Sequence, residues 1–399
     1  MMGKPIYITG TGIVSAIGND KQHTLQSLLR SESGIAPIRY LNTEHNEFPV
    51  GEVKLSNSEM RAILGIDEQK PLTRTSLLGA IAIKQAIKEA ILDDRQLNSA
   101  GLISGTTVGG MDTTELYYHD IISDNSKNSY INIHDCGATT ELSADMVGRF
   151  AFVTTLSTAC SSAANAIIAA ADMIRSGEAD IVIAGGAECL TKYHLNGFNT
   201  LMILDKEPCR PFDANRAGLN LGEGAAYVVL ESIESVNRRS ITPLAVLKGY
   251  ANACDAFHQT ASSACGDGAY LAMKNALSDG ETRVSDIDYI NAHGTGTPNN
   301  DESETAAMKR LFGDNMPDVS STKSLTGHTT SASGAIETVI CVLAINNNFT
   351  PVNVNWKNRM ENGIIPVQDI RSKKPIKNVL CNSFAFGGND SSLLISKYN

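Results

Sequence analysis

The sequence predicts an α/β fold built from two similar halves, because short strand-like runs alternate with helix-like stretches along the chain. The strand-like runs are apolar and rich in β-branched residues, as in strands covered on both faces, and lie at residues 5–9, 180–184 and 289–292. The helix-like stretches lie at residues 75–92, 161–176, 269–278 and 333–346. Glycine pairs follow the three runs, and we expect each strand to end before its pair: Gly10 and Gly12, Gly185 and Gly186, Gly294 and Gly296.

A weak internal sequence repeat predicts that the fold arose by duplication of one half. A small-residue helix opens at residues 157–164 after a strand, and a similar passage begins at residues 321–325. Both halves also end on alike strand-like runs, at residues 226–231 and 392–396. We therefore expect an N-terminal half, residues 1–242, and a C-terminal half, residues 243–399. Since no Pro/Ser/Gly-rich linker separates them, the halves should pack as one unit.

Composition predicts a large core and an oligomer. Of 399 residues, 42% are hydrophobic and only 19% are charged, against about 25% charged in an average soluble protein. The net charge of −10 argues against a general nucleic-acid binder, which needs a basic face. The chain is neither poor in apolar residues nor low in complexity, which excludes disorder.

Cysteine usage and the N-terminus predict a reduced, soluble, cytoplasmic protein. None of the eight cysteines lies within ten residues of another, so there is neither a C-x-x-C pair nor a secreted disulfide framework. The N-terminus lacks the apolar stretch of a signal peptide. The longest uncharged run, residues 150–171, carries too many polar residues for a membrane helix. No carboxylate and histidine cluster has the spacing of metal ligands, so we expect no metal.

Cys160 is the strongest candidate for a catalytic residue. It falls between the strand-like residues 152–156 and the helix-like residues 161–176, where the positive end of the helix dipole favours a thiolate. Tiny neighbours leave room for a substrate to approach. The other seven cysteines are interpreted as small buried residues.

Two histidines and two glycine-rich segments add to this candidate site. His293 follows a strand in AHGTGTP, and His328 lies five residues after Lys323 in STKSLTGH. The segment at 105–110 and the segment at 384–389 are typical of turns that line a cavity. The second could present backbone N–H groups as an oxyanion hole. No phosphate-binding loop pattern occurs, so we expect no nucleotide cofactor, and the combination favours acyl transfer on a cysteine nucleophile.

At these residues the chain resembles the β-ketoacyl synthases of the KAS I/II type, condensing enzymes of the thiolase superfamily that act on acyl carrier protein (ACP). The resemblance runs over essentially the whole length. Its motifs are TACSS at 158–162, RPFD at 210–213, GEG at 222–224, AHGTGTP at 292–298, STKSLTGH at 321–328 and NSFAFGG at 382–388. It implies a five-layered α-β-α-β-α thiolase-like fold from two duplicated halves, and a homodimer.

The resemblance also implies roles for the candidate residues. Cys160 takes the acyl group, and His293 and His328 hydrogen-bond the malonyl thioester during decarboxylation. Lys323 holds His328, with Glu337 as acidic partner of that network. The backbone N–H groups of Cys160 and Phe386 form the oxyanion hole, and the Phe386 ring is the gate. The remaining substrate-binding assignments are an acyl pocket at Val108 and Phe198, pantetheine contacts at Thr295 and Thr297, and further contacts at Phe384 and Gly387.

The implied reaction is a decarboxylative condensation of acyl-ACP with malonyl-ACP in fatty acid biosynthesis. Because both the carrier and this chain are acidic, docking needs a local basic patch. The candidates for it are Arg61, Lys70, Arg74, Lys127 and Lys206.

Departures from the family pattern open an alternative pathway. The usual FGFGGTN is FAFGGND here, with Ala385, Asn389 and Asp390, and the usual GAAG after the second histidine is SASG at 331–334. The usual Arg-Asp-Gly after RPFD is Arg-Ala-Gly at 216–218. These changes leave the catalytic groups in place but affect which acyl substrate the site accepts. A specialised ketosynthase of a polyene, aromatic pigment or polyketide pathway is therefore the alternative to fatty acid biosynthesis.

Other functions fit less well. A silent chain-length partner subunit would lack the nucleophile, and a degradative thiolase would carry a second catalytic cysteine near the C-terminus. A synthase initiating with acyl-coenzyme A would have asparagine in place of His328. Nothing marks the water-activating arrangement of a cysteine hydrolase.

Overall fold

The computed structural model describes residues 5–120, 123–370 and 375–398. Ten strands form a continuous mixed sheet in the order β3-β2-β4-β5-β1-β6-β10-β9-β7-β8. They are β1 (Ile6–Ser15), β2 (Gly101–Gly105), β3 (Phe152–Leu156), β4 (Ile181–Glu188), β5 (Gly224–Glu231), β6 (Ala245–Cys254), β7 (Tyr289–Asn291), β8 (Asp318–Ser320), β9 (Asn378–Ala385) and β10 (Asn389–Ser396).

The α-helices lie singly or in groups between these strands along the chain. They are α1 (Lys21–Arg30), α2 (Asn57–Leu64), α3 (Arg74–Ala90), α4 (Asp94–Ser99), α5 (Met111–Tyr117), α6 (Asn128–Ile131), α7 (Cys136–Asp145), α8 (Ser162–Ser176), α9 (Lys192–Thr200), α10 (Ile233–Arg239), α11 (Asp267–Asp279), α12 (Pro298–Phe312), α13 (Lys323–Thr326) and α14 (Ser333–Asn347). The four helix-like stretches expected from the sequence correspond to α3, α8, α11 and α14.

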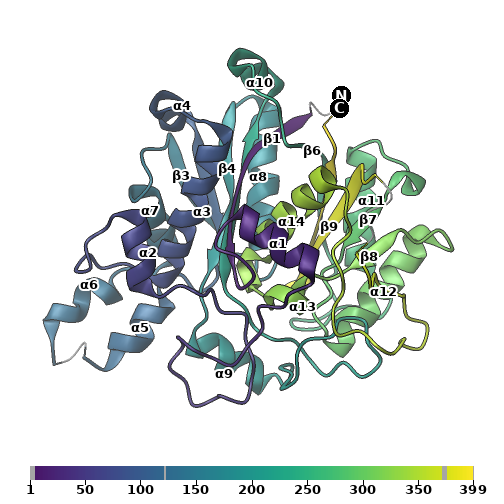
Figure 1. The fold of residues 1–399 in the computed structure, drawn as a ribbon, viewed down its shortest axis with the longest axis horizontal. Coiled ribbons are helices and arrows are strands. Elements are labelled where there is room, and N and C mark those ends of the chain that lie inside the picture. Colours follow the sequence, from purple (N-terminus) through teal and green to yellow (C-terminus); the bar gives the residue numbers. More distant parts are fainter. Residues whose placement is uncertain (1–4, 121–122, 371–374, 399) are drawn as a thin grey trace.

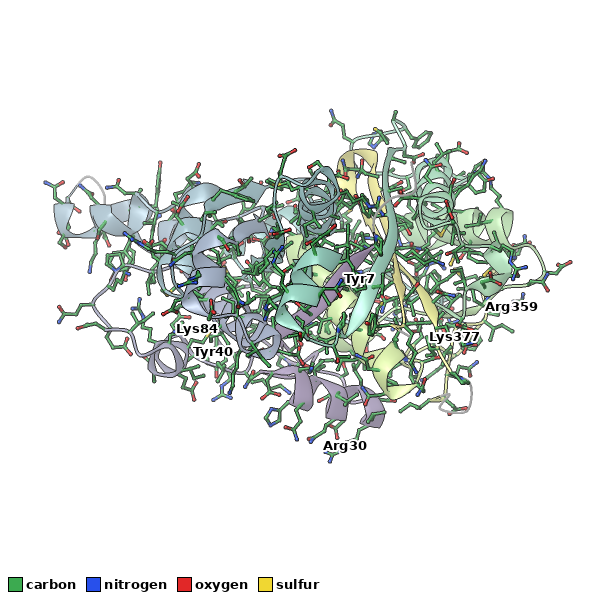
Figure 2. All side chains as sticks on the ribbon, turned by 90° about the horizontal axis from the view of Figure 1, so that it is seen from above. Tyr7, Arg30, Tyr40, Lys84, Arg359 and Lys377 are labelled. Carbon is green, nitrogen blue, oxygen red and sulfur yellow. The ribbon has the colours of Figure 1, made fainter. Side chains whose placement is uncertain are left out.

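The two halves of the sheet repeat one topology. Reading outward from the seam, the first half runs β1, β5, β4, β2, β3 and the second runs β6, β10, β9, β7, β8. Each strand thus has a counterpart five strands later, with antiparallel pairing near the seam and parallel pairing at the outer edge. β1 and β6 join the halves through pairs such as Tyr7 with Val246, and Tyr7 lies near the middle of the molecule in Figure 2.

Helices cover both faces of each half and fill the space between them (Figure 1). α3 packs on β1, β4 and β5, and α11 packs on β6 and β10. α8 contacts β2 and β4, while α14 contacts both β5 and β9 as well as α8. These layers and the repeated topology agree with the predicted α/β fold of two similar halves. The division at residue 242, which falls in the connection between α10 and β6, stays a prediction.

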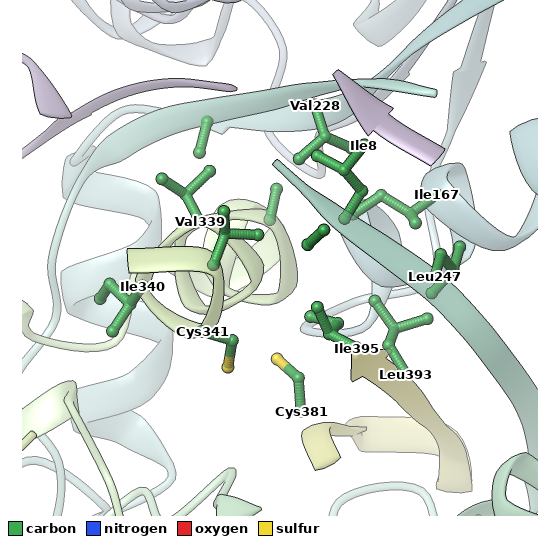
Figure 3. Close-up of a cluster of buried hydrophobic side chains, with 14 of the residues drawn as sticks. Ile8, Ile167, Val228, Leu247, Val339, Ile340, Cys341, Cys381, Leu393 and Ile395 are labelled. Atoms are coloured by element: carbon green, nitrogen blue, oxygen red, sulfur yellow. The ribbon is translucent and has the colours of Figure 1, made fainter. Parts of the chain in front are cut away.

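The core lies between the two halves. Residues 333–345 of α14 are all buried, as expected for a helix with apolar or small residues on every side, and its one carboxylate, Glu337, is paired with Lys323. Figure 3 shows Val339 and Ile340 of this helix beside Ile8, Val228 and other strand residues from both halves. A helix packed this way holds its first turn rigidly, and that turn borders the candidate site.

The glycine pairs correct one prediction. Gly10 and Gly12 lie inside β1 rather than beyond it. Glycine is needed there because α3 approaches the strand so closely that a Cβ at Gly12 would lie 1.9 Å from the Ala82 carbonyl oxygen. Gly185 and Gly186 likewise lie inside β4, where a Cβ at Gly185 would lie 2.0 Å from the carbonyl oxygen of the adjacent strand. Gly294 and Gly296 do follow β7, with φ of +37° and +82°.

Candidate active site

Cys160 lies in a tight turn between β3 and α8. Ala159 adopts the left-handed φ of +51°, a conformation that costs a residue with a Cβ about 1 kcal/mol or more. The Ser162 hydroxyl holds this turn by donating to the Ala159 carbonyl at 2.6 Å. Cys160 is 6% exposed. The turn therefore places the thiol at the entrance of α8, between the two halves.

The second half delivers two histidines to this thiol. His328 Nε2 lies 3.1 Å from Cys160 Sγ. The rings of His293 and His328 meet edge to face, with centroids 5.3 Å apart. The structure thus brings Cys160, His293 and His328 together from three separate segments, as the sequence predicted.

Lys323 occupies a different place from the one predicted. Its Nζ lies 3.3 Å from His293 Nδ1 and is paired with Glu337. It contacts His293 rather than His328, because α13 turns the lysine toward the end of β7. Glu337 is its acidic partner, as expected. Burial raises the pKa of Glu337 to about 7, against the lowering effect of the lysine.

Burial and the nearby charges keep Cys160 and both histidines uncharged in the resting site. Burial raises the pKa of the Cys160 thiol to about 12, with the Lys323 ammonium opposing the shift. Burial and the same ammonium hold the pKa of both His293 and His328 well below its usual range. The thiolate expected from the helix dipole is therefore not favoured, because burial outweighs it. The resting nucleophile is a thiol facing a neutral imidazole.

The segment after β9 closes over the nucleophile. The Phe386 backbone N–H hydrogen-bonds to the Cys160 sulfur, which opposes the rise in the pKa of the thiol caused by burial. The Phe386 ring stacks on Phe198 with centroids 6.1 Å apart. Phe384 lies against His293, at 6.0 Å between ring centroids. Gly387 has φ of +82°. Ala385 is extended, with φ of −125°, so the loss of glycine at this position takes no needed freedom from the turn.

Two buried glutamates hold the surrounding loops and were missed by the sequence analysis. Glu188, at the end of β4, accepts hydrogen bonds from the backbone N–H groups of Thr107 and Val108 and from the Ser331 hydroxyl. Glu304 accepts from the backbone N–H groups of His293 and Gly294, at 2.8 and 2.7 Å. Glu188 stands alone in the apolar and small-residue run 181–190, which was a signal for a buried carboxylate, whereas Glu304 follows the acidic stretch 301–302 and carries no such signal.

The Asn389 that replaces the usual threonine links the gate segment to the nucleophile turn. Its Oδ1 accepts from the Ser161 hydroxyl at 2.8 Å and from Asn165 Nδ2 at 2.7 Å. The neighbouring Asp390 is the second residue of β10, and burial beside Asp255 raises its pKa to about 8. Asn389 therefore connects the segment that carries Phe386 to the start of α8.

Among the residues predicted to contact substrate, Val108 is buried, and Thr295 and Thr297 lie with their hydroxyls 2.9 Å apart.

Two of the five cations predicted to form the basic docking patch are not available to a carrier. Arg74 is buried in an ion pair with Glu223, and the Arg61 guanidinium donates to backbone carbonyls. Both cations hold the fold and are not free to meet a carrier.

Two absences hold for the part of the chain that the structure describes. No group of three or more histidine, cysteine or acidic side chains is placed to hold a metal ion. No helix has both the length and the hydropathy needed to cross a bilayer.

Comparison with known proteins identifies the family. The N-terminal domain model of β-ketoacyl synthases matches residues 3–235, and the C-terminal domain model matches residues 244–357. A 3-oxoacyl-[acyl-carrier-protein] synthase 2 from Coxiella burnetii is 34% identical, over 100% of this chain and 99% of its own length. Nodulation protein E from Rhizobium meliloti is also 34% identical, over 98% and 99%.

Solved structures agree with these matches. The ishigamide ketosynthase/chain length factor superposes with a TM-score of 0.93 at 29% identity, covering 99% of this chain and 100% of that one. The ketosynthase ApeO in complex with its chain length factor ApeC, from Xenorhabdus doucetiae, gives 0.84 at 28% identity, covering 99% and 98%. The chain belongs to the β-ketoacyl synthase family, the acyl-transferring condensing enzymes of the thiolase superfamily, and is of the KAS II type.

Proposed function

We propose that the protein condenses an acyl thioester with malonyl-ACP by decarboxylative Claisen chemistry, with Cys160 as the nucleophile. The observation that carries the proposal is the 3.1 Å contact between Cys160 Sγ and His328 Nε2. A buried thiol with a pKa near 12 is unreactive alone, so an adjacent neutral base is the group that this site needs.

In the first half-reaction, His328 Nε2 takes the thiol proton as Cys160 Sγ attacks the acyl thioester carbonyl. The carbon–sulfur bond to the carrier then breaks, and the carrier leaves as a thiol after taking up a proton. Backbone N–H groups at Cys160 and Phe386 stabilise the transient oxyanion. The product is an acyl-Cys160 thioester.

In the second half-reaction, malonyl-ACP loses CO₂ and its electron pair passes into an enolate. His293 and His328 donate from Nε2 to the thioester oxygen that carries this charge. The enolate carbon attacks the acyl-Cys160 carbonyl, and the carbon–sulfur bond to Cys160 breaks. The β-ketoacyl-ACP leaves, and the cysteine sulfur regains its proton.

The direct test is mass spectrometry of the protein after incubation with an acyl-ACP. We expect one acyl mass on the peptide that contains Cys160, and none in Cys160→Ala, which should also lose turnover. Cys189→Ala is a matched control, because Cys189 is also a buried thiol but is not among the proposed catalytic residues. Turnover retained in Cys160→Ala would overturn the proposal.

For the pathway, relatives named 3-oxoacyl-[acyl-carrier-protein] synthase 2 support fatty acid elongation. A second candidate, a specialised ketosynthase, is supported by the likeness to the ishigamide ketosynthase/chain length factor and by the SASG and FAFGGND departures. Turnover of saturated, unsaturated and aryl-polyene acyl-ACP primers separates them. A preference for saturated primers supports elongation, and a preference for polyene or aryl primers supports the specialised pathway.

We also propose that the protein works as a homodimer and docks ACP through exposed lysines. Large apolar side chains are exposed on α5, just after it and around α9, where these two helices touch: Leu116, Tyr118, Tyr193, Leu201 and Met202. A second copy would cover them. Lys70 and Lys206 remain exposed and Lys127 lies partly exposed over Tyr117, so these three remain the candidate docking cations.

A further inference from the structure

The Ser333 hydroxyl lies on the far side of the His328 ring from the nucleophile. Its Oγ is 3.0 Å from His328 Nδ1, while Nε2 of the same ring faces Cys160. Ser333 is the first residue of α14 and is 1% exposed. None of the proposed steps uses it. It belongs to the SASG segment, where the family pattern has an alanine.

A second hydroxyl extends this contact. Thr329 Oγ1 lies 3.2 Å from Ser333 Oγ, and either oxygen can be the donor. Thr329 is 1% exposed, so solvent does not compete for these two groups. The imidazole is therefore backed by a short chain of hydroxyls whose hydrogen atoms are free to rotate.

The proposed reaction places opposite demands on the imidazole. In acyl transfer, Nε2 accepts the thiol proton, so the ring starts with its hydrogen on Nδ1. In decarboxylation, Nε2 donates to the thioester oxygen, so Nδ1 carries no hydrogen and must accept. A backbone N–H on Nδ1 favours only the second tautomer, and a carbonyl or carboxylate favours only the first.

A hydroxyl suits both tautomers. It accepts from Nδ1–H with a lone pair, or donates its own hydrogen to bare Nδ1 after rotation about the Cβ–Oγ bond. We propose that Ser333 is a positioning residue that supports both tautomers of His328, with Thr329 as its own hydrogen-bond partner. No proton passes through Ser333. Between the half-reactions, after the first carrier has left, the ring turns away from Ser333 toward the vacated thioester side, where water gives a proton to Nε2 and removes the hydrogen from Nδ1.

This inference rests on the roles proposed above for Cys160 and His328. The test is Ser333→Ala, which installs the residue of the family pattern and removes no packing beyond the hydroxyl. The two half-reactions are measured separately: acylation of Cys160 in a rapid quench with acyl-ACP, and CO₂ release from malonyl-ACP by the preformed acyl-enzyme. We expect both to slow by about tenfold, as for one buried hydrogen bond.

The matched control is Thr338→Val, which removes another buried hydroxyl of α14, one that donates to the Gly334 carbonyl and does not touch the ring. It should slow neither half-reaction. A pH profile of Cys160 alkylation gives a readout that lost packing would not move. Because the Ser333 oxygen accepts from the Nδ1–H of an imidazolium, its removal disfavours the charged ring, and the acid limb should move to lower pH.

Three outcomes would overturn the inference: unchanged rates in Ser333→Ala, slowing of only one half-reaction, or equal slowing in Thr338→Val. Failure of the proposed function looks different, since it would show as acylation that persists in Cys160→Ala. A normal Ser333→Ala protein beside an inert Cys160→Ala protein would therefore reject only the role of the hydroxyl.

Discussion

Replacing His328 by alanine should change how the reactivity of Cys160 depends on pH. In the wild-type protein the thiol has a pKa near 12, and the pKa of the facing imidazole lies well below 6.5. The imidazole is therefore neutral and able to accept a proton at every pH above its own lowered pKa. Alkylation of Cys160 by iodoacetamide should be flat between about pH 6.5 and 9, and should fall only on acidification.

The variant loses the acceptor that lies 3.1 Å from Sγ, so its alkylation must pass through free thiolate. A thiol of pKa near 12 is ionised to about one part in 10⁵ at pH 7, and this fraction rises tenfold with each pH unit. General-base assistance contributes about 10²–10⁴-fold. We expect His328→Ala to react slower by that factor at pH 7, and the gap to narrow toward pH 9.

Peptide mass spectrometry after timed alkylation measures this profile, because it separates Cys160 from the exposed Cys254 and Cys265. His23→Ala, at an exposed histidine on α1, is the control and should keep the wild-type curve. A flat profile in His328→Ala, or a tenfold rise per pH unit in the wild-type protein, would refute the assignment of His328 as the base.

Two further predictions concern stability. The Asp112 carboxyl lines a cavity of about 370 Å³ beside α2, α3 and α5, where Oδ1 has no partner and burial raises the pKa to about 6 from 3.8. Its ionisation opposes folding progressively as pH rises from about 4 to 6, so Asp112→Asn should be more stable by about 3 kcal/mol in urea unfolding at pH 8 and equal near pH 3.5; equal stability at pH 8 would contradict this. Gly12→Ala should cost at least about 2 kcal/mol by the same assay, because its Cβ would meet the Ala82 carbonyl at 1.9 Å. Gly197→Ala, with open space around its Cβ, should cost nothing.

The fold was largely predictable from local patterns. Apolar runs and small-residue helices gave four helices close to their observed bounds, and the sequence repeat between segments 157–164 and 321–325 marks equivalent strand-to-helix passages. The misplaced glycines show the limit. Gly10 and Gly185 stand in glycine pairs that are typical of turns, but each lies inside a strand. Glycine is needed there because a helix or a neighbouring strand leaves no space for a side chain. Only packing between distant segments decides that.

The structure brings together candidate residues that the sequence named, but the contacts and protonation states of these residues were harder to predict. The sequence and the family resemblance together named Cys160 and both histidines, since each stands in a short motif. The family resemblance implied that Lys323 holds His328, but the lysine at the start of α13 contacts His293 instead. The predicted protonation state of Cys160 was also wrong, because burial by the opposite half sets its pKa.

The position of Lys323 has a consequence for the proposed condensation. Burial, together with a single buried ammonium, lowers the pKa of both His293 and His328, so neither ring is an imidazolium at neutral pH. An imidazolium facing the enolate would be acidic enough to protonate it and end the reaction before carbon–carbon bond formation. A neutral ring still donates a hydrogen bond from Nε2 but holds its proton. The lysine therefore supplies positive potential for the developing charge while keeping its own proton away, since it contacts His293 at Nδ1, on the opposite side of the ring from Nε2.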